Sequence, residues 1–221
     1  MNANKRIGVV LAGSGVFDGS EIHEAVITLL ALDRAQAQII MMAPNVPQMH
    51  VIDHQKGQPA AGETRHVLTE AARIARGEVK DIAQITANDL DGLVFPGGYG
   101  AAKNLCDFAV KGVDCSVNPE VARLIKEMHA AKKPMGFICI APVLAAKVLG
   151  QLHPELTIGN DAQTAEAIEK MGGKHVTRRV DEIAEDSTHK IISTPAYMLG
   201  PSISHVAQGI EKLVARLIKL A

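Results

Sequence analysis

The sequence predicts a three-layer α/β/α fold in which helices cover both faces of a mostly parallel sheet. Short apolar runs, typical of strands buried on both faces, alternate along the chain with segments whose apolar residues recur at helical spacing. Such alternation indicates parallel strands joined by helices. The 221 residues, of which 47% are hydrophobic, suffice for a core without disulfide or metal support, and we predict one domain over residues 1–221.

The strands are predicted from apolar runs that stop at glycine or proline. The first run, 7–11, lies between two basic residues and Ala12-Gly13, and Pro44 ends the second. A third run begins at Asp91 and leads into the turn Pro96-Gly97-Gly98. In chain order, strands are expected at 7–11, 38–43, 91–95, 133–139, 156–158, 175–180 and 190–193, with a hairpin strand at 50–53.

The helices are predicted from apolar periodicity and from residues that start or stop a helix. Ser20 is expected to cap the first helix, in which Ile22, Val26, Leu29 and Leu30 recur at helical spacing. The others are expected at 63–76, 119–131, 140–149, 161–171 and 202–220.

Charge and motif content exclude several classes of ligand. Lys plus Arg number 23 and Asp plus Glu number 24, so no basic field exists for nucleic acid or a membrane surface. The loop after the first strand lacks a full dinucleotide fingerprint, and no phosphate-binding loop motif occurs. We therefore predict no nucleotide cofactor and no nucleic-acid or membrane partner. The three cysteines form no C-x-x-C pair, and His50 and His54 lie in an extended or turn-like segment, so we predict no metal or other cofactor. The odd cysteine count indicates a reducing compartment, and we predict a cytoplasmic location.

Cys139 is the strongest candidate for chemistry. It ends an apolar strand and precedes a helix, so unpaired N–H groups and the helix dipole are expected to favour its thiolate. The N–H groups of Ile140 and Gly98 are expected to stabilise an oxyanion beside it. The alternative is that Cys139 is an ordinary buried side chain, which is the interpretation we adopt for Cys106 and Cys115.

Four ordered segments and the short motif at 63–65 resemble the ThiJ/PfpI superfamily of class I glutamine-amidotransferase-like proteins, which has a flavodoxin-like sheet. Two of them, 95–104 (FPGGYGAAKN) and 136–142 (GFICIAP), carry the superfamily pattern. The other two, 13–25 (GSGVFDGSEIHEA) and 194–198 (TPAYM), together with Glu63-Thr64-Arg65, resemble its ElbB branch of glyoxalase or isoprenoid-biosynthesis-associated proteins. The resemblance covers essentially the whole chain.

The resemblance implies a role for each matching residue. Cys139 takes the place of the nucleophile, and Glu24 that of the carboxyl group beside it, which would shuttle a proton. Glu21 is the fallback carboxyl, although it could instead serve the first turn of the helix. Glu21, Gly97 and Asn104 are expected in the substrate site.

The chain also departs from its superfamily. Ile140 stands where the proteases carry histidine, and Ala141 where amidotransferases carry the second glycine. The segment 157–161, where related enzymes often carry a histidine, has none. A full triad is not expected, which disfavours peptide and glutamine hydrolysis because both need a proton donor for an amine leaving group.

The sequence and the resemblance together predict a glutathione-independent glyoxalase, an enzyme that converts glyoxal or another small 2-oxoaldehyde to the 2-hydroxy acid through a cysteine hemithioacetal. The scarcity of aromatic residues also favours a small substrate. The alternative is a non-catalytic or redox-responsive accessory protein with an oxidisable cysteine, associated with isoprenoid biosynthesis. The resemblance further implies a homodimer.

Overall fold

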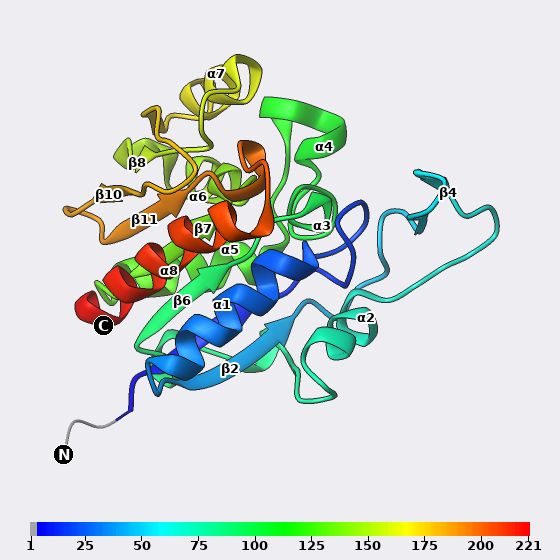
Figure 1. Ribbon diagram of the computed structural model, residues 1–221, viewed down its shortest axis with the longest axis horizontal. Helices are drawn as coiled ribbons and strands as arrows, with labels where there is room; N and C mark the ends of the chain where they lie inside the picture. The colour runs from blue at the N-terminus through cyan, green and yellow to red at the C-terminus, as the bar shows by residue number, and fades with distance from the viewer. Residues whose placement is uncertain (1–3) are drawn as a thin grey trace.

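A seven-stranded sheet forms the centre of the computed structural model, which describes residues 4–221 (Figure 1). All neighbouring strands are parallel except the edge pair β10–β11. The order across the sheet is β10 (Ala184–Asp186), β11 (Ile191–Thr194), β7 (Met135–Ile138), β6 (Gly92–Phe95), β1 (Arg6–Val10), β2 (Gln38–Ala43) and β5 (Lys80–Asp81).

Helices cover both faces of this sheet, which confirms the predicted three-layer α/β/α class with a flavodoxin-like sheet (Figure 1). One face carries α1 (Ile22–Arg34), α2 (Val67–Ile74) and α8 (Ile203–Leu220). The other face carries α5 (Pro119–Ala130), α6 (Pro142–Leu149) and the shorter α3 (Tyr99–Lys103), α4 (Phe108–Lys111) and α7 (Ala162–Lys170). None of the helices in residues 4–221 has the length and apolar character needed to cross a membrane.

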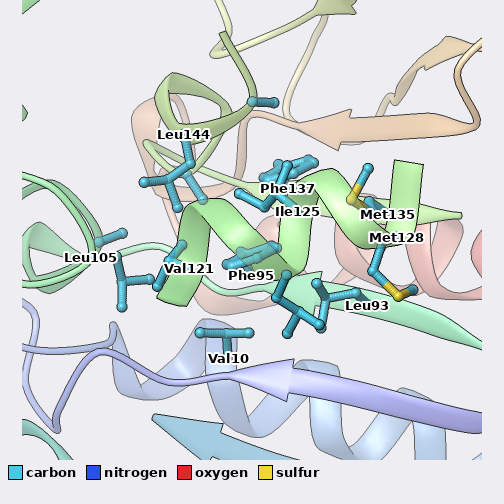
Figure 2. Packing of buried hydrophobic residues seen from close by; sticks show 14 of the residues in the cluster. Val10, Leu93, Phe95, Leu105, Val121, Ile125, Met128, Met135, Phe137 and Leu144 are labelled. Atoms are coloured by element: carbon cyan, nitrogen blue, oxygen red, sulfur yellow. The ribbon is translucent and has the colours of Figure 1, made fainter. Parts of the chain in front are cut away.

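Alternate residues of the central strands pack into opposite layers. Leu93 and Phe95 of β6 belong to the cluster that contains α5 and α6, whereas Val94 belongs to the cluster with α1 and α8. Phe95 stacks on Phe137 of β7 with ring centroids 4.9 Å apart, as Figure 2 shows beneath α5. Both faces of each central strand are buried, which explains why these strands appear in the sequence as continuous apolar runs.

The remaining elements are short. The predicted hairpin is present as β3 (Ile52–Asp53) and β4 (Gln58–Pro59). The predicted strand at 175–180 is wrong in extent, because β9 (Lys174–His175) pairs only with β8 (Glu155–Leu156), outside the central sheet. Single 3₁₀ turns occupy Ile82–Gln84, Ala87–Asp89, Gly112–Asp114, Gly150–Leu152 and Ala196–Met198.

The predicted cap of the first helix is wrong by one residue. The Ser20 hydroxyl accepts a hydrogen bond from the Ala12 N–H at 2.8 Å, so it ties the loop to β1. Glu21 is the cap, since its Oε2 accepts from the Glu24 N–H at 2.7 Å. A carboxylate meets the same unpaired N–H groups that a serine hydroxyl would.

The strand order places a ligand site between β1 and β6. The chain runs from β1 outward to β2 and β5, then returns to β6 on the other side of β1 and continues to β7 and β11. Ligands bind beyond the carboxyl ends of the strands at such a reversal. The loops after β1, β6 and β7 all meet there.

Candidate active site

Cys139 occupies a strained turn between β7 and α6. Its φ of +61° is left-handed, a conformation that costs a non-glycine residue about 1–2 kcal/mol. The Ala141 N–H donates to the Ile138 carbonyl at 3.0 Å and closes the turn, and Pro142 begins α6. The Cys139 N–H donates to the Thr194 carbonyl at 3.0 Å, so β11 fixes the turn from the other side. This is the sharp strand-to-helix turn that the sequence predicts.

Two backbone N–H groups lower the pKa of the Cys139 thiol and so lie beside its sulfur, those of Gly98 and Ile140. Gly98 has a φ of +92°, and a Cβ there would lie 2.3 Å from the Glu21 nitrogen. Only glycine therefore allows this loop to close on the start of α1, where the Glu21 N–H donates to the Gly97 carbonyl at 2.9 Å. The two donors proposed for an oxyanion site thus converge on the candidate nucleophile.

The Glu24 carboxyl group is fully buried beside the same sulfur. Its Oε2 accepts from the Gly97 N–H at 2.9 Å, its Oε1 accepts from the Tyr197 N–H at 3.2 Å, and the Cys139 thiol is close enough to shift its pKa. Burial, and secondly the charge of Glu21, raise the pKa of Glu24 to about 8, against the lowering effect of the two N–H donors. Glu24 therefore carries a proton at neutral pH.

The protonation of Cys139 differs from the sequence-based expectation. Burial is the largest cause that raises the pKa of its thiol, the charge of an ionised Glu24 is the second, and the two N–H donors only partly offset them. The helix start alone does not make the sulfur a thiolate, because desolvation outweighs it. When Glu24 is protonated its charge is removed, and its O–H can donate to the sulfur instead.

A cavity of about 790 Å³ opens over the Cys139 sulfur. Cys139, Glu21, Gly98 and Ile140 form its floor. Its walls come mainly from three further segments, namely the start of α3, residues 108–113 and α7, with Val16, Tyr197 and Met198 completing them. Three of the six aromatic side chains line it: Tyr99, Phe108 and Tyr197. The inference from aromatic scarcity to a small ligand is therefore weak, because the few aromatics gather here.

The other predicted site residues take different positions. Glu21 lines the cavity and also caps α1. Gly97 lies behind the sulfur, where an added Cβ would be 2.5 Å from the Cβ of Cys139 and 2.7 Å from Glu24 Oε2. The expected substrate contact of Asn104 is not supported: it does not line the cavity, and its amide is engaged by the Met49 N–H and the Ala12 and Asp18 carbonyls at 2.8–3.0 Å. Asn104 clamps the loops around the site.

Tyr197 and α7 are parts of the site that the sequence did not reveal. The Tyr197 N–H holds Glu24, and its hydroxyl is hydrogen-bonded to His23 Nδ1 at 2.8 Å. From α7 and its cap, Asp161, Thr164 and Lys170 face the cavity. Residues 194–198 stand out in the sequence only as a motif, and nothing in the spacing of α7 shows that it folds over the cysteine.

No protein-family model matches the chain. A human protein named glutamine amidotransferase-like class 1 domain-containing protein 3, mitochondrial, is 50% identical over 224 residues, covering 97% of this chain and 83% of the relative. The chain belongs to the glutamine amidotransferase-like class 1 family. The amidotransferase-like resemblance seen in the sequence is thereby confirmed.

Solved structures agree with this amidotransferase-like assignment. An isoprenoid biosynthesis protein with an amidotransferase-like domain from Ehrlichia chaffeensis is 39% identical, with a TM-score of 0.90, covering 98% of this chain and all of that one. Drosophila melanogaster DJ-1beta shares the fold alone, at 16% identity and a TM-score of 0.57 over 99% of this chain and 96% of that one. The fold is that of the DJ-1/ThiJ/PfpI superfamily.

The name of the human relative describes that protein as mitochondrial, so the comparisons do not support the predicted cytoplasmic location.

Proposed function

We propose that this amidotransferase-like protein is a cysteine-dependent enzyme that converts small 2-oxoaldehydes to 2-hydroxy acids, as a glutathione-independent glyoxalase. One observation carries the proposal: a buried sulfur at a strained turn lies beside two backbone N–H groups and a buried carboxyl group whose pKa is raised to about 8. The three features suit nucleophilic attack, oxyanion stabilisation and proton transfer, respectively.

The chemistry balances without an external cofactor. The Cys139 sulfur bonds to one aldehyde carbon of glyoxal, and its proton ends on the new hydroxyl, which gives a hemithioacetal. Glu24, in its ionised form, then takes the hydrogen of that carbon as a proton and returns it to the neighbouring carbon through an enediol, which leaves a glycolyl thioester. Water cleaves the thioester and releases glycolate and the free thiol. The sum is glyoxal plus water to glycolate.

Aldehyde chemistry fits this cavity better than amide hydrolysis. Among residues 4–221, none of the side chains that line the cavity is a histidine. Amide hydrolysis must protonate an amine as it leaves, whereas an aldehyde carbon has no leaving group to protonate. One carboxyl group that can both give and take a proton is sufficient for the hydrogen shift.

The cavity also bears on which aldehyde is preferred. Its volume of about 790 Å³ falls within the range that holds drug-sized ligands, so glyoxal would fill little of it. The residues that line the cavity include three with carboxyl groups, Glu21, Asp161 and Glu166, and one with an amine, Lys170. We therefore propose that uncharged 2-oxoaldehydes larger than glyoxal are better substrates than anionic ones.

The test is turnover of glyoxal, methylglyoxal and phenylglyoxal, with the 2-hydroxy acid product measured by NMR. Cys139→Ala is expected to abolish turnover, and Glu24→Gln to lower kcat at least 100-fold, since it removes the proton carrier. Cys115→Ala, assayed under reducing conditions, is the matched control and retains activity. Full turnover by Cys139→Ala would refute the proposal.

The accessory, redox-responsive role is the competing function. It is favoured if kcat/KM for every aldehyde lies far below about 10⁴ M⁻¹s⁻¹, the lower end of the usual enzyme range. The same buried sulfur would then act by being oxidised rather than by turning over substrate.

A further inference from the structure

The two cysteines outside the candidate active site lie against each other. The chain doubles back between them, since the Asp107 N–H donates to the Ser116 carbonyl at 3.2 Å and the Asn118 N–H donates to the Leu105 carbonyl at 2.8 Å. Cys106 consequently pairs with Val117 in a short antiparallel bridge. The bridge closes a loop of residues 107–116, of which 107–114 lie between the two cysteines.

The bridge directs both sulfur atoms to the same side. Side chains alternate along a strand, so Cys115 shares a face with Val117, which lies opposite Cys106. Both cysteines are buried, and each thiol shifts the pKa of the other, as expected of two neighbouring sulfur atoms. The Cys106 thiol donates to the Ala101 carbonyl at 3.3 Å, and the Cys115 thiol to Met171 Sδ at 3.9 Å.

The two thiols are chemically unequal. The neighbouring Cys106 thiol lowers the pKa of Cys115 to about 7, with help from the charge of Lys147, although burial opposes it. The interaction with Cys115, and then burial, raise the pKa of Cys106 well above its usual range. Lys147 is held nearby, because its Nζ donates to the Val113 carbonyl at 2.8 Å. The positive charge of Lys147, held beside the turn that leads into Cys115, favours the Cys115 thiolate, so we assign Cys115 as the nucleophilic member of the pair and Cys106 as the resolving one.

We propose that Cys106 and Cys115 are a reversible redox site that a hydroperoxide converts to an intramolecular disulfide. The Cys115 thiolate attacks the peroxide oxygen, breaks the O–O bond, and becomes a sulfenic acid, while hydroxide leaves and takes up a proton. The Cys106 sulfur then displaces the sulfenic hydroxyl, which leaves as water with the Cys106 proton. Two thiols are oxidised, and one hydrogen peroxide is reduced to two waters.

This site is joined to the cavity wall but is separate from Cys139. The loop that the disulfide would close carries Phe108, Ala109, Gly112 and Val113, all of which line the cavity. Met171, against Cys115, caps α7 and directly follows the lining residue Lys170. Oxidation would therefore stiffen one wall of the cavity without changing the candidate nucleophile. The redox site does not depend on the proposed aldehyde activity.

The experiment uses the full chain with Cys139→Ser, which leaves only these two thiols. After treatment with a few equivalents of hydrogen peroxide, intact mass spectrometry should show the loss of two hydrogen atoms and peptide mapping a 106–115 crosslink that dithiothreitol reverses. Adding Cys106→Ser should leave Cys115 as a sulfenic acid trapped by dimedone, whereas Cys115→Ser should leave Cys106 unmodified.

Amide hydrogen exchange of residues 107–114 is the second measurement. It should slow on oxidation of the Cys139→Ser protein and recover on reduction. The proposal is overturned if both thiols remain fully alkylatable after peroxide, or if Cys115 passes to the sulfinic acid while Cys106 is present. A disulfide with unchanged exchange would overturn its link to the cavity wall. None of these readouts requires turnover, so failure here is distinct from failure of the aldehyde activity.

Discussion

Glu24 links the chemistry of a single residue to the stability of the protein. The folded chain keeps the Glu24 proton up to a pH of about 8, whereas the unfolded chain loses it near the ordinary value of 4.5. Between these values the unfolded state binds fewer protons, so this residue makes the free energy of unfolding fall as the pH rises. The limiting slope is about 1.4 kcal/mol per pH unit.

Glu24→Gln is therefore expected to flatten the decline of stability between pH 4.5 and 8. Urea unfolding at several pH values measures this slope directly. Asp33→Asn, an exposed change on the same helix, is the control and should follow the wild-type slope. Parallel curves for Glu24→Gln and the wild type would show that the carboxyl group is ionised in the folded state.

At the residue scale the sequence identified the reacting pair but not its protonation. Cys139 is marked by its place between an apolar strand and a helix, and Glu24 by the resemblance. The direction of the Cys139 pKa could not be predicted, because it depends on how completely other segments bury the sulfur. The proximity of Cys106 and Cys115 could not be predicted for a related reason, because it depends on how residues 107–114 fold back along the chain.

At the scale of elements, the glycine turn after β6 allows two costs of replacing a glycine to be separated: the strain of a left-handed backbone and the steric clash of an added Cβ. Gly98 and Gly77 have nearly the same φ, +92° and +91°, yet a Cβ on Gly98 would meet Glu21 at 2.3 Å, whereas one on Gly77 meets nothing within 4 Å. Gly77→Ala is expected to cost about 1 kcal/mol from its left-handed backbone alone.

Gly98→Ala is expected to cost several kcal/mol more than Gly77→Ala, and to remove activity, because the loop must leave the start of α1. Thermal unfolding of both variants, together with the reactivity of Cys139 toward iodoacetamide, gives the comparison. Equal destabilisation by the two substitutions would mean that the contact between this loop and α1 contributes little to stability.

The elements themselves were predictable where they are long and apolar. The runs that became β1, β2, β6 and β7 were found because both of their faces are buried. The edge strands β5 and β10 were missed, since they are two and three residues long and carry charged residues. Helix α4 was not predicted, and α7 was predicted as a helix over 161–171 but not as a wall of the cavity, because neither segment carries a motif.

At the scale of the whole molecule, a homodimer stays a prediction of the resemblance. Helix α1 exposes Ile22, Val26 and Leu30, each 44–48% accessible and spaced four residues apart, so they form one apolar stripe. A second copy would bury this stripe. Val26→Asp should then give a monomer in analytical ultracentrifugation, while Val110→Asp, on the exposed side of α4, should not. A dimer that survives Val26→Asp would place the interface elsewhere.

The Glu24 carboxyl group is held by Gly97 and by Tyr197, residues separated by a hundred positions in the chain. During synthesis on the ribosome, therefore, Cys139 is incorporated well before residues 194–197, the segment that completes its surroundings. A nascent chain that ends before β11 lacks both the Thr194 carbonyl and the Tyr197 N–H, and its cysteine reacts as an ordinary thiol. Cys139 therefore acquires its distinctive reactivity toward electrophiles only after the C-terminal segment has been synthesised and has folded. Labelling of Cys139 with an electrophile would report when folding is complete.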